Sequence, residues 1–496
     1  MKIDPIMDLQ ASAEFEKRYF ENTAADSLSV IRKVGKKIAK DFFKQTACKP
    51  KRIALLLGKG NNAADAVAFA LSACKKFPKC KIDIALLFDE SKLGANLRVL
   101  LGELKNAFGA DFKNLQQMAK FGYSIVVEGI AAMRFSGAIS PEFCGYVNAA
   151  NSLQSDYKIA VDLPFGIGEK PASTAFVADY TYATGIAKKP LFCDFNAKYV
   201  GRIRYVDIGF FDGEKEKASQ YIYNAKQSLH FFKKLRRSDT DKRSYGFLTI
   251  VGGSREYKGA VLLNAKGALK SGIGLLRVCV SEGLDIAFAV NEPSAMWTPC
   301  PVCENGFLAL EGLKDIAKYA GKSTALLLGS GAGRTFETRA LFIELIKNFN
   351  CPIVLDADAI CPECLQACKD ANRHVLICPH NGEFLRLAKD SSDQSLMQVA
   401  KQYNATVMLK GRFVRVCDGK NIVVNTEGTP ALARGSTGDM LAGIAASLLA
   451  NKEFNLSLPE AALAAYSILG KAANKAAKKC GENAIIASEI LQYIKR

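Results

Sequence analysis

The sequence of 496 residues predicts an α/β protein in two domains, and three observations carry this prediction. Short β-rich apolar runs alternate with helical stretches along the whole chain, which is typical of mostly parallel sheets. Gly-rich loops follow several of the apolar runs. The stretch 213–242 is charged, rich in Tyr and Lys and without clear strands. We therefore expect a boundary near residue 225, with domains at 1–225 and 226–496.

The apolar runs define the expected elements of each half. In the first half we expect strands at 52–57, 81–87, 124–127, 158–162 and 180–184. In the second half we expect strands at 247–251, 275–280, 324–328, 352–355, 374–377 and 406–409. A hairpin of 413–417 and 421–425 follows, with Asp418-Gly419 as a type I′ pair. Helices at 437–449 and 459–479 close the chain.

The composition excludes several classes of protein. With 49% hydrophobic and 23% charged residues, the chain is neither disordered, collagenous nor a coiled coil. No apolar run reaches the ~18–20 residues of a membrane span. Residues 1–10 lack the charged-then-apolar pattern of a signal peptide, so we expect a cytoplasmic protein without membrane attachment.

The net charge of +18 raises the question of a polyanionic partner. Clustered Lys and Arg on one face would neutralise nucleic-acid phosphates. Here the basic residues are spread along the chain, and the densest stretch, 233–237, lies between the two halves. We favour a basic surface that attracts small anionic substrates over nucleic-acid binding.

Fifteen cysteines are too few for a disulfide scaffold in a chain of this length. Two CxxC pairs, Cys300–Cys303 and Cys361–Cys364, are followed by Cys368. The pairs lie much further apart than the ~12–20 residues usual in a zinc knuckle. We favour reduced thiols, with a metal cluster as the alternative.

Three Gly-rich loops follow expected strands, at 58–65, 252–260 and 329–333. Backbone N–H groups at such a loop, with a following helix N-terminus, can hold an anion such as a pyrophosphate. Any one loop could be an ordinary turn. Since several of them lie at strand carboxyl ends, the sequence predicts a ligand crevice at that edge of the sheet.

The strongest local pattern is Gly435-Ser-Thr-Gly-Asp439 immediately before an apolar helix. Small residues let the backbone approach a phosphate, and Asp439 could accept a proton from a substrate hydroxyl. The alternative is a helix N-cap. Three carboxylates follow expected strands and could bind a Mg²⁺–nucleotide or a ribose: Asp356, Asp358 and Glu383. His380 could contact a ligand. Lys410-Gly411 could contact an adenine nucleotide.

Taken in order, the motifs of the second half resemble those of the bifunctional NAD(P)H-hydrate repair enzymes. This family joins an NAD(P)HX epimerase domain to an ADP-dependent (S)-NAD(P)H-hydrate dehydratase domain. The resemblance implies a Rossmann-like three-layer αβα domain followed by a ribokinase-like αβα domain. The motifs that carry it are 242–246, 251–254, 259–260, 329–333, 354–359, 379–384, 409–411 and 435–443.

The resemblance implies roles for residues of the second half. Ala260, Gly331, Gly333 and His380 would contact the hydrated nicotinamide nucleotide, NADHX or NADPHX. Asp439 would be the base in phosphoryl transfer from ADP or ATP, with Mg²⁺, to the C6 hydroxyl, and loss of phosphate would restore the dihydronicotinamide. Ser330 and Ser436 replace the family's usual Pro and Gly. The residues implied to hold the nucleotide are Lys410, Gly411, Arg412, Phe413, Val414, Gly435, Ser436, Thr437 and Gly438.

The resemblance of the first half rests on 20–24, 58–62, 127–134 and 162–166. It implies Asp162 as the proton-transfer carboxylate and a K⁺ site at Asn62 and Glu128. Glu128 replaces the family's Asp, and Phe165 replaces a Ser and has no side-chain oxygen. These departures put K⁺ binding and epimerase activity in question. The residues implied to contact the substrate are Asn61, Asn62, Ala63, Ala64 and Asp65, where Ala63-Ala-Asp-Ala66 replaces Gly-Gly-Asp-Gly.

Two other readings stay open at this point. The second half could be a ribokinase-like kinase of a small alcohol, because such a kinase also places a base beside an anion hole. The first half could be a catalytically silent binding or scaffold module. The loop Pro379–Glu383 and the fused first domain favour the hydrate-repair reading. We also expect a homo-oligomer.

Overall fold

The computed structural model describes residues 1–496 except 24, 131–138, 140, 213–215 and 495–496. The chain divides into two compact units, residues 4–219 and residues 1–3 with 220–496. This division lies a few residues before the predicted 225 because Gln220–Tyr223 forms strand β10, which pairs with β19 (Ile422–Asn425). The sequence analysis placed no strand there, since the run is short and half polar.

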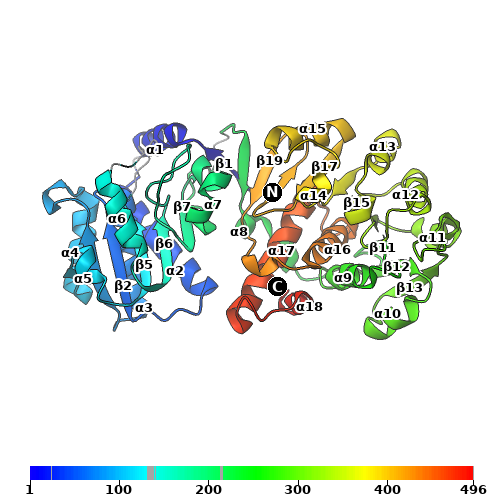
Figure 1. The fold of residues 1–496 in the computed structure, drawn as a ribbon, viewed down its shortest axis with the longest axis horizontal. Helices are drawn as coiled ribbons and strands as arrows, with labels where there is room; N and C mark the ends of the chain where they lie inside the picture. Colours follow the sequence, from blue (N-terminus) through cyan, green and yellow to red (C-terminus); the bar gives the residue numbers. More distant parts are fainter. Residues whose placement is uncertain (24, 131–138, 140, 213–215, 495–496) are drawn as a thin grey trace. The chain divides into compact units, whose positions relative to one another are not determined.

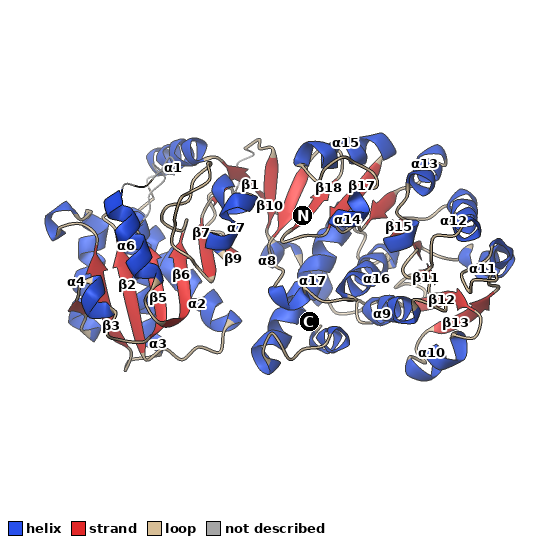
Figure 2. Ribbon diagram, in the orientation of Figure 1, coloured by secondary structure: helices blue, strands red, loops and turns tan. Residues whose placement is uncertain are grey.

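In the unit 4–219, parallel strands form one sheet in the order β4-β3-β2-β5-β6-β7-β9 (Figure 2). Strand β2 alternates: Ile53, Leu55 and Leu57 pack in one core, and Ala54 and Leu56 in another. Helices therefore cover both faces, as the predicted α/β class requires. The strands are β2 (Arg52–Leu57), β3 (Lys81–Leu86), β4 (Asp111–Phe112), β5 (Tyr123–Gly129), β6 (Ser155–Val161), β7 (Tyr180–Thr184) and β9 (Arg202–Val206).

The helices on one face of this sheet are α1 (Leu9–Thr23), α2 (Ser27–Gln45), α3 (Asn61–Lys76) and α4 (Ala95–Phe108). The other face carries α5 (Leu115–Met118) and α6 (Pro141–Asn151). A short strand pair, β1 (Ile3–Met7) with β8 (Ala187–Lys188), places Met7 opposite Lys188. That pairing fixes Lys188 in an extended segment just after β7.

In the unit that contains 220–496, the sheet runs β13-β12-β11-β14-β15-β16-β17-β18-β19-β10 (Figures 1 and 2). It is parallel from β13 to β17, and the β17–β18–β19 pairs are antiparallel. The remaining strands are β11 (Phe247–Val251), β12 (Leu275–Ser281), β13 (Met296–Cys300), β14 (Ala325–Leu328), β15 (Ile353–Leu355), β16 (Val375–Ile377), β17 (Ala405–Leu409) and β18 (Val414–Cys417).

Helices also cover both faces of this sheet, so the predicted α/β class is confirmed for both units. One core contains α9 (Lys258–Leu269), α10 (Asp285–Asn291), α16 (Thr437–Ala450) and α17 (Leu458–Cys480). The opposite core contains α11 (Leu313–Ala320), α12 (Phe336–Asn348), α13 (Pro362–Asp370) and α15 (Asp393–Tyr403). In Figure 1 these two sets of helices lie on opposite sides of the strands.

Several details of the sequence prediction are wrong, among them the absence of strands β1, β4, β8 and β9 from it. The β18–β19 turn is not type I′, because that turn needs positive φ at both central residues and only Gly419 has it (φ +81°). The loop spans 418–421, and the Asp418 carboxylate accepts the amides of Lys420 (2.9 Å) and Asn421 (2.8 Å). Strand β13 was also missed, because Pro299 interrupts its apolar pattern.

Candidate functional site

In both units the glycine loops lie where the strand order reverses. In the second unit the chain passes from β11 outward to β12 and β13, and then returns to β14 on the other side of β11. Ligands of open parallel sheets bind at the carboxyl ends of the strands at such a switch point. The loops that follow β11 and β14, at 252–254 and 329–333, meet there.

The contact between these two loops requires glycine. The Gly253 amide donates to the Ser330 carbonyl at 2.9 Å. A Cβ on Gly252 would lie 2.6 Å from the same carbonyl oxygen. Gly331 has φ +62°, and a Cβ there would lie 2.8 Å from the Tyr257 carbonyl oxygen and 3.1 Å from Ala260 Cβ. The structure therefore brings the predicted residues Ala260 and Gly331 together.

Gly333 is fixed by neighbours on the same edge. Its amide donates to Asp358 Oδ2 at 3.0 Å, and a Cβ would overlap the ring of Phe307. Asp358 also pairs with Arg334 at 2.8 Å. Asp358 therefore positions the 329–333 loop.

Lys410 is the centre of a buried charge cluster at the ends of β15, β16 and β17. Its Nζ lies 3.1 Å from Asp356 Oδ1 and 3.9 Å from Glu383 Oε2. Ser330 Oγ donates to the second oxygen of Asp356 at 2.8 Å, so the Ser that replaces the family's Pro holds this carboxylate. Burial lowers the pKa of Lys410, but Asp356 and Glu383 raise it by more, and the ammonium form is favoured.

Asp439 lies in the first turn of α16, beside this cluster. The pKa of Asp439 is raised to about 7, mainly by burial and also by the negative charges of Asp356 and Glu383. The positive charge of Lys410 opposes this rise. A Cβ on Gly438 would lie 3.2 Å from Lys410 Nζ, so the ammonium group faces the start of the helix. The helix N-cap is Ser436, in the left-handed region at φ +72°, and not Asp439. Asp439 is therefore a half-buried carboxyl group that can accept a proton near neutral pH.

His380 caps a short helix through hydrogen bonds, and its imidazole ring is accessible. It is the N-cap of α14 (Asn381–Phe384), where its Nδ1 accepts the Glu383 amide at 3.3 Å and the His380 amide donates to Glu383 Oε2 at 2.8 Å. Nε2 lies 3.5 Å from Glu383 Oε1. The side chain is still 59% exposed, so its ring can also contact a ligand.

The residues implied to hold the nucleotide differ in what they can offer. Gly411, Arg412, Gly435 and Ser436 are exposed, while Val414 is buried and can contact a ligand only through its backbone. The Thr437 hydroxyl already donates within its loop, to the carbonyls of Leu432 (2.9 Å) and Arg434 (3.0 Å). Arg412 stacks over the ring of Phe413 at 4.5 Å.

The first unit has its own switch point, between β2 and β5. The Gly58 amide donates to the Gly129 carbonyl at 3.2 Å, and a Cβ on Gly129 would lie 2.5 Å from the Asn62 carbonyl oxygen. Asn61 is exposed at the start of α3, but Ala63 and Ala64 are completely buried in that helix. Of the quoted first-half motifs, Ala24 and residues 131–134 lie outside the described residues.

Asp162 directly follows β6 and has φ +68°, a conformation unusual for any residue except glycine. Lys188 Nζ lies 2.6 Å from Asp162 Oδ1 and 3.9 Å from Glu16 Oε1. Burial raises the pKa of Glu16 to about 7 and the pKa of Asp65 well above its usual range. The sequence analysis named Asp65 and Asp162 but missed Lys188 and Glu16, which belong to no motif it quoted.

The residues implied to bind K⁺ do not fit that ion. Glu128 is fully buried, and its two oxygens accept the backbone amides of Ile130 and Phe165 (3.0 Å for the latter). Phe165 offers no side-chain oxygen, and its buried ring packs against Phe143 at 5.7 Å. The Glu128 carboxylate therefore holds two loops together by accepting their backbone amides. A carboxylate that served as a cation ligand would not need these amides.

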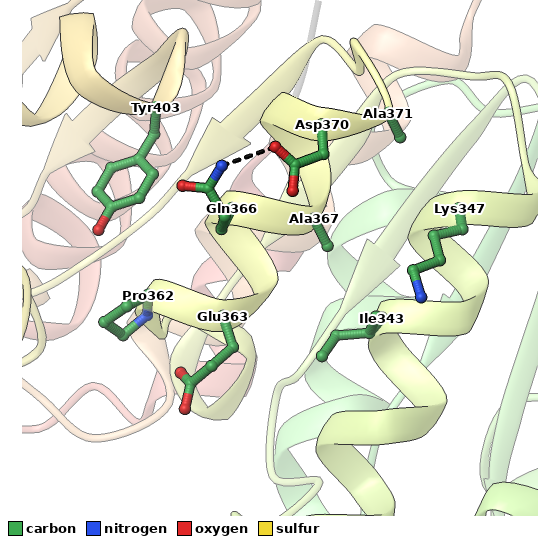
Figure 3. A pocket seen from close by; sticks show the side chains of 9 residues that line it. All are labelled: Ile343, Lys347, Pro362, Glu363, Gln366, Ala367, Asp370, Ala371 and Tyr403. Carbon is green, nitrogen blue, oxygen red and sulfur yellow. Dashed lines mark hydrogen bonds between the residues drawn. The ribbon is translucent and has the colours of Figure 1, made fainter.

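The described residues, those of the two sites included, hold no group of three or more His, Cys, Asp or Glu arranged for a metal ion. The same residues include no helix with the length and apolarity for crossing a bilayer. A surface hollow beside α13 contains none of the predicted site residues (Figure 3). Its lining is Ile343, Lys347, Pro362, Glu363, Gln366, Ala367, Asp370, Ala371 and Tyr403.

Two α/β units, each with glycine loops and buried carboxyl groups at its switch point, define a two-domain protein of the class that binds ligands at the carboxyl edges of its sheets. Comparisons with known proteins agree with this class. Residues 248–496 match the family described as NAD(P)H-hydrate dehydratase, and residues 27–190 match the family described as YjeF-related protein N-terminus. The second match begins after the quoted segment 20–24.

Curated relatives cover most of the chain. The bifunctional NAD(P)H-hydrate repair enzyme Nnr of Moorella thermoacetica is 28% identical, over 90% of this chain and 87% of its own length. The enzyme of the same name from Gloeobacter violaceus is 30% identical, over 81% of this chain and 80% of its own. The chain belongs to the family of bifunctional NAD(P)H-hydrate repair enzymes, which confirms the family predicted from its motifs.

Among solved structures, the ADP/ATP-dependent NAD(P)H-hydrate dehydratase of Bacillus subtilis, co-crystallised with ATP and Mg²⁺, is 23% identical. It aligns with 55% of this chain and 96% of its own, with a TM-score of 0.45.

Proposed function

We propose that the second unit dehydrates (S)-NAD(P)HX with ADP or ATP and that the first unit interconverts the R and S epimers. The observation that carries the dehydratase part of this proposal is Asp439: a half-buried carboxyl group with a pKa near 7, at the start of a helix whose Gly438 faces Lys410. A general base works best when its pKa lies near the working pH.

In the proposed reaction, Asp439 takes the proton of the C6 hydroxyl as that oxygen attacks the terminal phosphorus of the nucleotide, and the bond from this phosphorus to the bridging oxygen breaks to release AMP from ADP or ADP from ATP. Lys410 and the amides of 435–438 stabilise the transferring phosphoryl group, a step that depends mainly on positioning and charge. Phosphate then leaves C6, and a proton leaves the neighbouring ring carbon, which restores the dihydronicotinamide. The loops at 252–260 and 329–333 support the substrate, together with His380.

Mg²⁺ would enter on the nucleotide phosphates and neutralise their charge. It commonly needs only one or two protein carboxylates, because it keeps several waters. Asp356 already pairs with Lys410 and Ser330, and Glu383 accepts the His380 amide, so Mg²⁺ would be held mainly by the nucleotide phosphates and by water. Cytoplasmic location and a homo-oligomer stay predictions from the sequence.

The test uses the full chain with purified (S)-NADHX, in the presence of ADP, ATP or no nucleotide. We expect NADH only when a nucleotide is present. NADH formation without nucleotide would overturn the phosphoryl-transfer mechanism. Nucleotide consumption with a small alcohol, and none with NADHX, would favour the kinase reading instead.

A further inference from the structure

The first unit contains a buried charge cluster whose members come from four separate parts of the chain. Glu16 lies on α1, Asp65 on α3, Asp162 at the end of β6 and Lys188 on β8. Three carboxyl groups thus surround one ammonium group. The side chains of Lys188 and Asp162 are only 1% and 4% exposed, so their charges are almost completely removed from water.

Lys188 is the closest partner of Asp162. The 2.6 Å contact between Lys188 Nζ and Asp162 Oδ1 is a short charge-assisted hydrogen bond. Burial lowers the pKa of Lys188, but Asp162 and Glu16 raise it by more. Because Lys188 follows β7 in a strand paired with Met7, its backbone is held while its side chain reaches Asp162. Breaking a buried pair by removing one partner leaves an uncompensated charge, which is costly.

Asp65 is the unusual member of the cluster. Its side chain is 6% exposed, and its Oδ1 is buried without a hydrogen-bond partner among the described residues. Burial, followed by the nearby charges of Asp162 and Glu16, raises the pKa of Asp65 well above its usual range, and Lys188 opposes this only in part. Burial of Asp65 Oδ1 without a hydrogen-bond partner in the described part of the chain disfavours the charged form of this carboxyl group.

We infer that Lys188 is a positioning residue of the first unit's site: it orients the Asp162 carboxylate by direct contact. This inference rests on the proposed epimerase function. Epimerisation at a carbon that carries a hydroxyl needs a proton delivered to the departing oxygen and another taken from the water that returns on the opposite face. The two transfers cancel, so no co-reactant is consumed, and one acid and one base suffice.

The first test compares Lys188→Met with Lys188→Arg in the full chain, by following R-to-S conversion of NADHX chromatographically. We expect Lys188→Met to lower kcat by about 100-fold with KM nearly unchanged, since misplacing a catalytic group costs about that much. Lys188→Arg keeps the charge and should restore part of the rate. Lys189→Met is the matched control: Lys189 is the next residue, is 44% exposed, and should behave as wild type.

A double variant separates this role from a general loss of structure. If Lys188 acts through Asp162, then Asp162→Asn with Lys188→Met should be no slower than Asp162→Asn alone. Rate losses that multiply would overturn the inference, as would a Lys188→Met rate within about twofold of wild type. Thermal unfolding of each variant, followed for the transition of the unit 4–219, reports whether the first unit is folded, and dehydration of (S)-NADHX reports the same for the second unit.

The outcomes also distinguish this inference from the function on which it rests. If the wild-type chain dehydrates (S)-NADHX but does not interconvert the epimers, the epimerase proposal and the role of Lys188 both fail. If it interconverts them and Lys188→Met does so equally well, only the role of Lys188 fails.

Discussion

At the scale of single residues, the second unit depends on the protonation of Asp439. The same burial that brings its pKa to about 7 also makes its charged form unfavourable in the folded protein. A general base whose pKa lies near neutral pH therefore lowers the stability of the folded protein when it is charged.

We predict that Asp439→Asn lowers the dehydration rate by at least about 100-fold, the size usual for loss of a general base. The same variant should be more stable than wild type at pH 8. The pKa of Asp439 is higher in the folded wild-type protein than in the unfolded chain. At pH values between these two pKa values the folded protein binds more protons, so the free energy of unfolding of wild type decreases as pH rises toward 7.

Thermal unfolding at pH 5 and pH 8 checks this sign. We expect the variant's stability gain to be larger at pH 8, by roughly 1–3 kcal/mol for the unit's transition. A gain of equal size at both pH values would contradict a raised pKa. A variant with wild-type activity would contradict the role of Asp439.

A second prediction concerns the pH profile of wild-type dehydration. Since only the ionised carboxylate can accept a proton, kcat/KM should fall as pH decreases below about 7. Glu383→Gln removes a negative charge that raises the pKa of Asp439, so the profile should move to lower pH. Gln can still accept the His380 amide and keep the α14 cap. A profile that does not move would contradict the electrostatic coupling.

The sequence located some of these residues and could not locate others. Asp439 was found because it belongs to the compact motif 435–439, whose neighbouring residues all suit phosphate binding. Lys188 and Glu16 lie far from Asp65 and Asp162 in the chain, and each looks like an ordinary charged residue. Only the fold brings them within reach, and only burial makes their charges significant.

At the scale of elements, the close approach of α9 and α16 places Asp439. Asn264 on α9 donates to the Asp439 carbonyl at 2.7 Å, and a Cβ on Gly443 of α16 would lie 2.1 Å from the Asn264 carbonyl oxygen. Small residues therefore let the two helices meet backbone to backbone.

We predict that Gly443→Ala destabilises the second unit by about 1–3 kcal/mol, as overpacking does, and lowers dehydration because α16 must move. Gly321→Ala is the control, since Gly321 has open space around its Cβ position and an ordinary helical backbone. Thermal unfolding and activity of both variants test this prediction. Equal stability of the two variants would contradict it.

Strands made mainly of aliphatic, aromatic and β-branched residues were predicted to the residue, as β2, β7 and β11 show. Those with a Pro or several polar residues, β13 and β10, were missed. In those strands the pairing partners, rather than the strand's own sequence, decide the structure.

At the scale of the whole molecule, the net charge of +18 needs no nucleic acid, because every proposed substrate is a phosphorylated anion. The two units also differ in how far they keep the family's pattern. The second keeps Asp439, Lys410 and His380 of the quoted motifs, whereas in the first Glu128 replaces the usual Asp and accepts the amides of Ile130 and Phe165.

We therefore predict that epimerisation by this chain does not depend on K⁺. Rates in K⁺ and Na⁺ buffers of equal ionic strength should agree within about twofold, a difference of less than ~0.5 kcal/mol. Dehydration in the same buffers is the control for general salt effects. Epimerisation that requires K⁺ would show that Glu128 still coordinates it.

The most direct test of the central claim measures NADH and inorganic phosphate together while the full chain acts on (S)-NADHX with ADP or ATP. The proposed mechanism predicts one phosphate released for each NADH formed by wild type, and neither product from Asp439→Asn. NADH without phosphate, or no NADH with either nucleotide, would contradict it.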